Sequence, residues 1–132
     1  MQLLDHVSIT VPDLQAARPF YDAVMVALGA VKVYDRADAL GYGERSAAHA
    51  PGHSYFSVLQ SPAWARDPRR HWCFKAPSRR AVDAFHRAGL AHGGHSEGAP
   101  GLRPDYHAHY YAAFLADPAG NRIEAACHLA GS

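Results

Sequence analysis

A segment of this chain recurs 65 residues further on, and this internal repeat constrains the fold more than any other feature of the sequence. Residues 6–21, HVSITVPDLQAARPFY, align without a gap with residues 71–86, HWCFKAPSRRAVDAFH. The matched pairs are His6 with His71, Pro12 with Pro77, Ala16 with Ala81, Phe20 with Phe85 and, further on, Gly29 with Gly94. Because both segments have the pattern of a strand, a proline turn and an amphipathic helix, the repeat predicts two copies of one structural unit.

Alternation along the two repeated strands places each histidine on a polar face. In residues 3–11, three β-branched side chains share one face and His6 lies on the other. In residues 70–76, two aromatic side chains share one face, whereas His71 lies with Cys73 and Lys75 on the other. We therefore expect the apolar faces to lie under the helices that follow, and both histidines to point away from them.

The remaining elements complete each unit. Helices are predicted over 13–28 and 78–90, with Asp13 and Ser78 as N-caps and with Gly29 as a stop; Pro19 should kink the first helix or delay its start. Strands are predicted near 31–36, 39–44, 54–60, 109–116 and 121–128, and the stretch 91–107 should hold one short strand and then a long loop. The predicted fold is α+β, a single domain over 1–132. It comprises a βαβββ module at about 1–61, a linker at about 62–69 and a second βαβββ module at about 70–132.

Composition excludes several classes of function. The chain has 132 residues, 48% hydrophobic and 19% charged, with a formal net charge of +1, which argues against nucleic acid as the main partner. No apolar run approaches the length of a membrane span, and the first residues do not resemble a secretory signal. The two cysteines, Cys73 and Cys127, have opposite parity on their strands and are not expected to form a disulfide, so the reducing cytoplasm is the predicted compartment.

Three segments together resemble a known family. They are LDHVSITVPDLQAARPFY at the start, HWCFKAPSRRAVDAF in the middle, and the closing YYAAFLADPAGNRIEAA with its Asp117, Pro118, Gly120 and Glu124. In this order they are similar to the vicinal oxygen chelate superfamily, also called the glyoxalase, bleomycin-resistance and extradiol-dioxygenase superfamily. The closing motif is the most specific of the three.

The resemblance implies a fold and a metal site. The two modules would pair into a curved, cup-shaped mixed sheet with the helices on the outside, and the first strand of each module would neighbour its fourth. His71 and Glu124 would then lie on adjacent strands, with His6 contributed across the cup. Two imidazoles and one carboxylate suit one divalent ion of Fe, Mn, Zn, Ni or Co.

The resemblance also implies an activity. It would be a metal-dependent lyase, isomerase or dioxygenase acting on a small molecule with vicinal oxygens. The alternative is a metal-free, drug-sequestering protein of the bleomycin-resistance type, which lacks such a ligand trio. Glyoxalase I members usually offer a fourth ligand on the last strand of the first module, where this sequence has Phe56 or Ser57, and neither is a good ligand. This favours a three-ligand site and leaves the reaction open.

Side chains around the expected cavity are the remaining candidates. Alternation turns only one of Tyr110 and Tyr111 inward, where it could donate a hydrogen bond to the substrate or act as an acid. His109 and His107 precede them on a loop and are further catalytic candidates. Lys75 and Arg45 could bind an anionic group, with solvated charges as the expected alternative. The chain could close the cup alone or form a homodimer by exchanging modules, and we favour the dimer.

Overall fold

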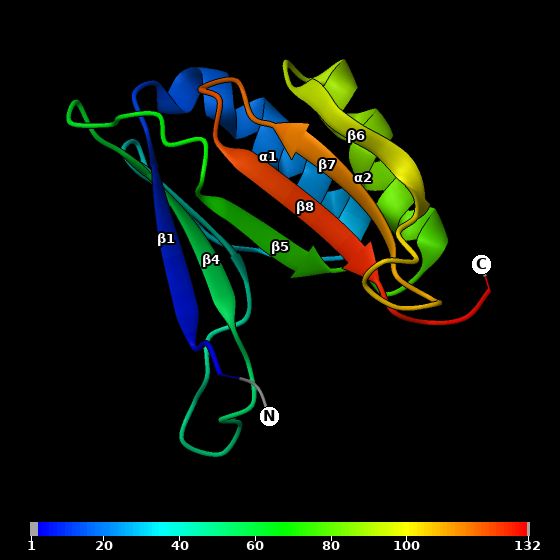
Figure 1. The fold of residues 1–132 in the computed structure, drawn as a ribbon. Helices are drawn as coiled ribbons and strands as arrows, with labels where there is room; N and C mark the ends of the chain where they lie inside the picture. Colours follow the sequence, from blue (N-terminus) through cyan, green and yellow to red (C-terminus); the bar gives the residue numbers. More distant parts are fainter. Residues whose placement is uncertain (1–2, 132) are drawn as a thin grey trace.

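The computed structural model describes residues 3–131, and its elements follow the order βαβββ twice (Figure 1). Module 1 comprises β1 (His6–Val11), α1 (Leu14–Leu28), β2 (Lys32–Asp35), β3 (Ala39–Gly43) and β4 (Tyr55–Gln60). Module 2 comprises β5 (His71–Lys75), α2 (Arg79–Ala91), β6 (His95–Leu102), β7 (Tyr111–Ala116) and β8 (Arg122–Cys127). The predicted fold class and the repeat are therefore confirmed.

The two sheets have the same topology. Their strand orders are β1-β4-β3-β2 and β5-β8-β7-β6, and in each sheet the first strand runs parallel to the fourth. The first strand of each module is therefore an edge strand, and its other side has no strand partner among residues 3–131. This register places His71 beside Arg122, and Cys73 beside Glu124.

Local sequence signals explain where the helices begin and end. The Asp13 carboxylate accepts hydrogen bonds from the backbone N–H groups of Gln15 and Ala16, and the Ser78 hydroxyl accepts one from Ala81. Gly29 ends α1 in the left-handed conformation at φ 79°, which suits a residue without a side chain. Pro19 lies inside α1, and the helix continues past it to Leu28.

The segment after α2 differs from its prediction. β6 spans eight residues and pairs with β7 along the whole of that strand, so it is longer than the short strand that was expected, and the expected loop follows it at 103–110. The pairing shifts register between Ser96 and Gly98 and again between Gly98 and Gly101. These irregularities break the alternation of side chains, which is why the strand signal is weak in the sequence.

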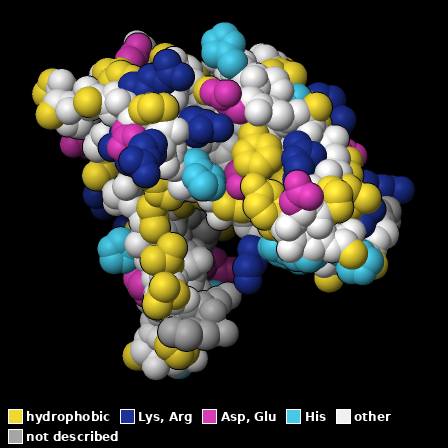
Figure 2. All heavy atoms as spheres, in the orientation of Figure 1, with side chains coloured by type: hydrophobic (Ala, Val, Ile, Leu, Met, Phe, Trp, Pro, Cys, Tyr) yellow, Lys and Arg dark blue, Asp and Glu magenta, His cyan; other side chains and the backbone are white. Residues whose placement is uncertain are grey.

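The modules share one hydrophobic core but do not close into a cup. Helices α1 and α2 pack against each other, and the ring of Phe56 contacts Phe74 of module 2 at a centroid separation of 5.0 Å while Tyr21 packs against Phe56 within module 1. In Figure 1 the strands β1 and β4 extend away from the sheet of module 2, and Figure 2 shows an open hollow between this limb and the body of the molecule. The expected cup is therefore present as two open halves in one chain. Within residues 3–131, neither helix is long and apolar enough to span a membrane.

Candidate metal centre

Glu124 is the centre of the candidate site. It lies on β8, the second strand of its sheet, directly opposite Cys73 on β5 and Phe114 on β7. Its side chain is on the face that alternation predicted, away from the helix, yet only 3% of the residue is exposed. A carboxylate removed from water to this degree requires compensation by hydrogen bonds or by a cation.

Two side chains approach this carboxylate. The Tyr110 hydroxyl donates a 2.5 Å hydrogen bond to Oε2, and Nε2 of His71 lies 3.6 Å from Oε1. No arginine or lysine pairs with Glu124 within the described residues. The structure therefore brings together Glu124, His71 and Tyr110, three of the residues singled out from the sequence.

The environment fixes the protonation of the nearest acids. Desolvation, and then the hydrogen bond to Glu124, raise the pKa of Tyr110 well above its usual value, so its hydroxyl keeps its proton at neutral pH. Desolvation and the Glu124 carboxylate also raise the pKa of Cys73 to about 12, so its sulfur is a thiol. Cys73 and Cys127 are both free, as alternation predicted.

His6 does not join this cluster within one chain. It heads β1, where its Nδ1 atom lies 2.7 Å from a carboxylate oxygen of Asp5 and its ring stacks on Tyr55 at a centroid separation of 5.0 Å. No three His, Cys, Asp or Glu side chains in residues 3–131 converge closely enough to hold a metal ion. One chain therefore presents two candidate ligands together and the third apart.

The position of the expected fourth ligand holds no metal-binding side chain. Phe56 points into the core, where its ring contacts Tyr21 and Phe74. Ser57 lies on the polar face of β4, but it is buried and accepts a 2.6 Å hydrogen bond from the Tyr34 hydroxyl.

The other catalytic candidates occupy different places. Tyr111 faces the opposite side of β7 from Glu124, and its hydroxyl donates a 2.6 Å hydrogen bond to Asp83 on α2. His109 is exposed, and its backbone N–H donates to Nδ1 of His107 at 3.0 Å. Of the adjacent tyrosines, Tyr110 is therefore the one that contacts the candidate site.

Two histidines pack against Tyr110: His107, which the sequence analysis singled out, and His128, which it did not. Because Nδ1 of His107 accepts the backbone hydrogen bond, its neutral ring carries the proton on Nε2, which donates to Nδ1 of His128 at 2.9 Å. Both rings meet Tyr110 edge to face, with centroid separations of 5.5 and 5.2 Å. His128 lies just beyond β8, and its only sequence signal is the end of a predicted strand that carries Glu124.

The closing motif is mostly structural. Asp117 is fully buried and accepts four hydrogen bonds: from the Tyr21 hydroxyl, from the backbone N–H groups of Ala119 and Asn121, and from the Asn121 side chain. The Asn121 side chain also donates to the backbone oxygen of Thr10 on β1. The motif therefore fixes the turn before β8 and ties it to module 1, which sets the position of Glu124.

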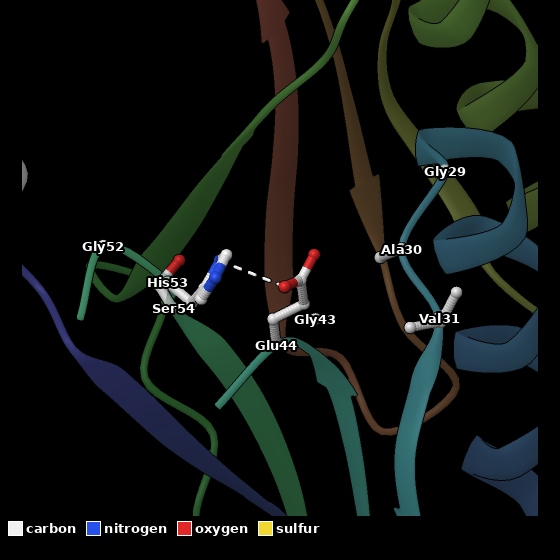
Figure 3. A pocket seen from close by; sticks show the side chains of 8 residues that line it. All are labelled: Gly29, Ala30, Val31, Gly43, Glu44, Gly52, His53 and Ser54. Carbon is white, nitrogen blue, oxygen red and sulfur yellow. Dashed lines mark ion pairs between the residues drawn. The ribbon is translucent and has the colours of Figure 1, made fainter. Parts of the chain in front are cut away.

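Two pockets open at the surface. One, of about 200 Å³, adjoins the candidate site and is lined by His71, Glu97, Tyr106, Phe114, Leu115, Arg122, Ile123 and Glu124. A larger one, of about 290 Å³, lies in module 1 where Glu44 and His53 point toward each other with a 3.1 Å ion pair (Figure 3). The smaller pocket is the better candidate for a substrate, because it contains the buried carboxylate and an imidazole.

Comparisons with known proteins agree with this architecture. The sequence model of the Glyoxalase/Bleomycin resistance protein/Dioxygenase superfamily matches residues 3–125. The crystal structure of a glyoxalase/bleomycin resistance protein from Albidiferax ferrireducens T118 is 32% identical, with a TM-score of 0.75 over 96% of this chain and 98% of that one. No curated protein sequence matches this chain.

Two further crystal structures show the fold alone. A glyoxalase/bleomycin resistance protein/dioxygenase family enzyme from Burkholderia phytofirmans PsJN is 20% identical, with a TM-score of 0.69 over 95% of this chain and 98% of that one. Lactoylglutathione lyase from Agrobacterium tumefaciens is 21% identical, with a TM-score of 0.62 over 96% of this chain and 94% of that one.

Proposed function

Because this chain belongs to the Glyoxalase/Bleomycin resistance protein/Dioxygenase superfamily, we propose that it is a divalent-metal-dependent enzyme acting on a small molecule with two vicinal oxygen atoms. The reaction is of the lyase, isomerase or dioxygenase type. Its expected compartment is the cytoplasm, which suits two free cysteines.

The buried carboxylate of Glu124 is the observation that carries the proposal. Its hydrogen bond from Tyr110 satisfies one oxygen, and no arginine or lysine of residues 3–131 neutralises its charge. Two ligands of a tetrahedral ion, each about 2.1 Å from it, lie about 3.4 Å apart. The 3.6 Å separation between Nε2 of His71 and Oε1 of Glu124 therefore fits two ligands of one ion.

We assign the third ligand to His6 of a second copy of the chain. Among residues 3–131, His6 does not converge with the pair, and Figure 2 shows an open hollow between the limb that contains β1 and β4 and the body of the molecule. A homodimer that joins module 1 of one chain to module 2 of its partner would bring the missing imidazole to each pair. Each dimer would then hold two equivalent sites.

The chain's own groups supply the remaining functions of the site. A bound Fe, Mn, Zn, Ni or Co ion would act as a Lewis acid toward vicinal oxygens of the substrate. Tyr110 keeps its proton and donates a hydrogen bond, which it can redirect from Glu124 to a substrate oxygen. The edge-to-face contacts of His107 and His128 hold its ring in place.

Metal analysis tests the ligand set. Protein purified without a histidine tag should bind about one equivalent of metal per chain after reconstitution with Zn, Fe, Mn, Ni or Co. His71→Ala and Glu124→Gln should each abolish this binding, whereas the control His92→Ala, at the exposed end of α2, should leave it unchanged. Less than about one-tenth of an equivalent in the parent protein would refute the proposal and favour a metal-free binding protein.

Mixing two inactive variants tests the shared site. His6→Ala and Glu124→Gln are unfolded together in equal amounts and refolded. In an exchanged dimer, half of the dimers pair one chain of each variant and each such dimer has one intact site, so about one quarter of all sites should recover metal. If both modules of one chain formed the site, the mixture would recover none.

A further inference from the structure

A line of aromatic rings and guanidinium groups runs across the polar face of module 1, beginning at the candidate ligand His6. The His6 ring stacks on Tyr55 with an angle of 14° between the planes. The guanidinium carbon of Arg45 lies 5.7 Å from the centroid of Tyr55 and 5.2 Å from that of Tyr34. Arg36 lies over the same Tyr34 ring at 4.7 Å. A continuous series of ring and guanidinium contacts thus connects two cationic groups to a candidate metal ligand.

The sheet below is shaped to hold Tyr34 flat. Tyr34 on β2 pairs with Gly41 on β3, and a Cβ atom at Gly41 would come within 2.3 Å of the Tyr34 ring. The absence of a side chain at Gly41 therefore makes room for the ring. Its hydroxyl is fixed by the hydrogen bond to the buried Ser57, which lies opposite Gly41 on β4. The aromatic surface under the two arginines is accordingly rigid.

Neither arginine has an acidic partner in residues 3–131. The acidic side chains of module 1 that form ion pairs are taken by other groups: Asp35 by Arg18 and Lys32, Asp22 by Lys32, Glu44 by His53, and Asp5 by His6. A guanidinium group stacked on a ring keeps its N–H edge available, and this edge matches the two oxygens of a carboxylate or phosphate group.

We propose that Arg36 and Arg45, supported by Tyr34 and Tyr55, form a binding site for an oxyanion group of the substrate. The substrate class is then a small molecule that carries a carboxylate or phosphate group near its metal-facing oxygens. This inference rests on the proposed function for its link to the substrate, whereas anion binding itself does not depend on metal. The sequence favoured a solvated charge at Arg45; the paired arginines and the flat ring beneath them favour a binding role.

Inorganic phosphate is the probe that tests the site. It is titrated into metal-free protein at constant ionic strength, with the arginine Nε–H and backbone amide signals followed by NMR. The signals of Arg36 and Arg45 should shift and saturate together. Arg45→Gln and Arg36→Gln should each weaken phosphate binding by at least about fivefold, because each removes one charge-assisted donor. Arg87→Gln, an exposed arginine on α2 of the other module, is the matched control and should bind phosphate normally.

Two variants separate this proposal from the metal proposal. Arg45→Gln should bind metal like the parent protein, and Glu124→Gln, on β8 of module 2, should lose metal but keep its phosphate affinity. The anion site is refuted if the arginine signals do not saturate, or if Arg87→Gln reduces binding as much as Arg45→Gln. A protein that binds phosphate at this site but no metal would refute the metal proposal alone. A titration with acetate distinguishes the two oxyanions, since the anion that binds with the higher affinity indicates whether the substrate carries a carboxylate or a phosphate group.

Discussion

The buried Asp117 network should contribute a large part of the stability of the fold. Asp117→Ala removes the acceptor of four hydrogen bonds, three of which come from Tyr21 and Asn121 inside the core. The Asn121 side chain keeps the backbone oxygen of Thr10 as an acceptor, and the Ala119 N–H can reach water because that residue is partly exposed. The Tyr21 hydroxyl and the Asn121 N–H have no such substitute.

The magnitude follows from these two stranded donors. Each buried donor left without a partner costs about 1–3 kcal/mol, so Asp117→Ala should lower the free energy of unfolding by about 2–6 kcal/mol. Tyr21→Phe leaves the carboxylate with three N–H donors and should cost only about 1.5–3 kcal/mol. The double variant should lose less than the sum, because Phe at position 21 removes one of the donors that Asp117→Ala strands.

Urea unfolding at a fixed protein concentration measures these differences. Trp64 is a suitable fluorescent reporter because its indole N–H lies 3.3 Å from the Asn121 side-chain oxygen. Asp105→Ala, in the exposed loop before Tyr106, is the control and should change stability by less than about 0.5 kcal/mol. A loss below about 1 kcal/mol for Asp117→Ala, or strict additivity with Tyr21→Phe, would refute the network as the source of stability.

Three further predictions concern titration, reactivity and packing. Burial and carboxylate partners raise the pKa values of four tyrosines, Tyr21, Tyr42, Tyr110 and Tyr111, so an alkaline titration followed at 295 nm should show fewer than seven tyrosinates until the chain unfolds. Because the pKa values in the folded chain exceed that of an unfolded tyrosine, these groups contribute stability below about pH 10, and the contribution declines as the pH rises above it. Cys73, with its pKa raised to about 12, should react with iodoacetamide at pH 8 at least about tenfold more slowly in folded metal-free protein than in urea, because the lower thiolate fraction outweighs the greater nucleophilicity of the thiolate. Glu124→Gln should speed the reaction, and equal rates in folded and unfolded protein would contradict the assignment. Gly94→Ala should lower the free energy of unfolding by about 1–3 kcal/mol, because the added Cβ would lie 2.4 Å from the Phe20 ring. Gly29→Ala adds a Cβ in open space but at a positive φ, so it should lower the free energy of unfolding by about 1 kcal/mol. The order of the two urea midpoints checks this prediction.

The sequence allowed the order of elements and the side of each strand to be predicted, because these depend on local periodicity. His71 and Glu124 could be placed on adjacent strands only through the family resemblance, and Tyr110 emerged as the inward tyrosine once the register was known. The two matched glycines of the repeat have different roles in the structure. Gly29 ends α1, whereas its match Gly94 provides space for Phe20, and the turn after α2 uses Gly93 at φ 93°.

The relation between the two modules could not be predicted from such patterns. It depends on contacts between distant segments, such as Tyr21 with Asp117 and Phe56 with Phe74. The repeat is compatible both with a cup closed in one chain and with one shared by two chains, since both use the same faces. The proposed role of Arg45 could not be predicted from the sequence for the same reason, because its partners Tyr34 and Tyr55 come from separate strands.

The open edges of the two sheets connect stability with the proposed site. β1 and β5 are edge strands, and unpaired edges expose backbone groups that favour association with another chain. His6 and His71 are the first residues of these same strands. In the proposed dimer, the association of the two chains also completes the ligand set, so metal binding and dimerisation stabilise each other. Removing the metal should therefore weaken the dimer, and His6→Ala should do so even when metal is supplied. A dimer whose dissociation constant is unchanged by chelation would show that the interface does not contain the metal site.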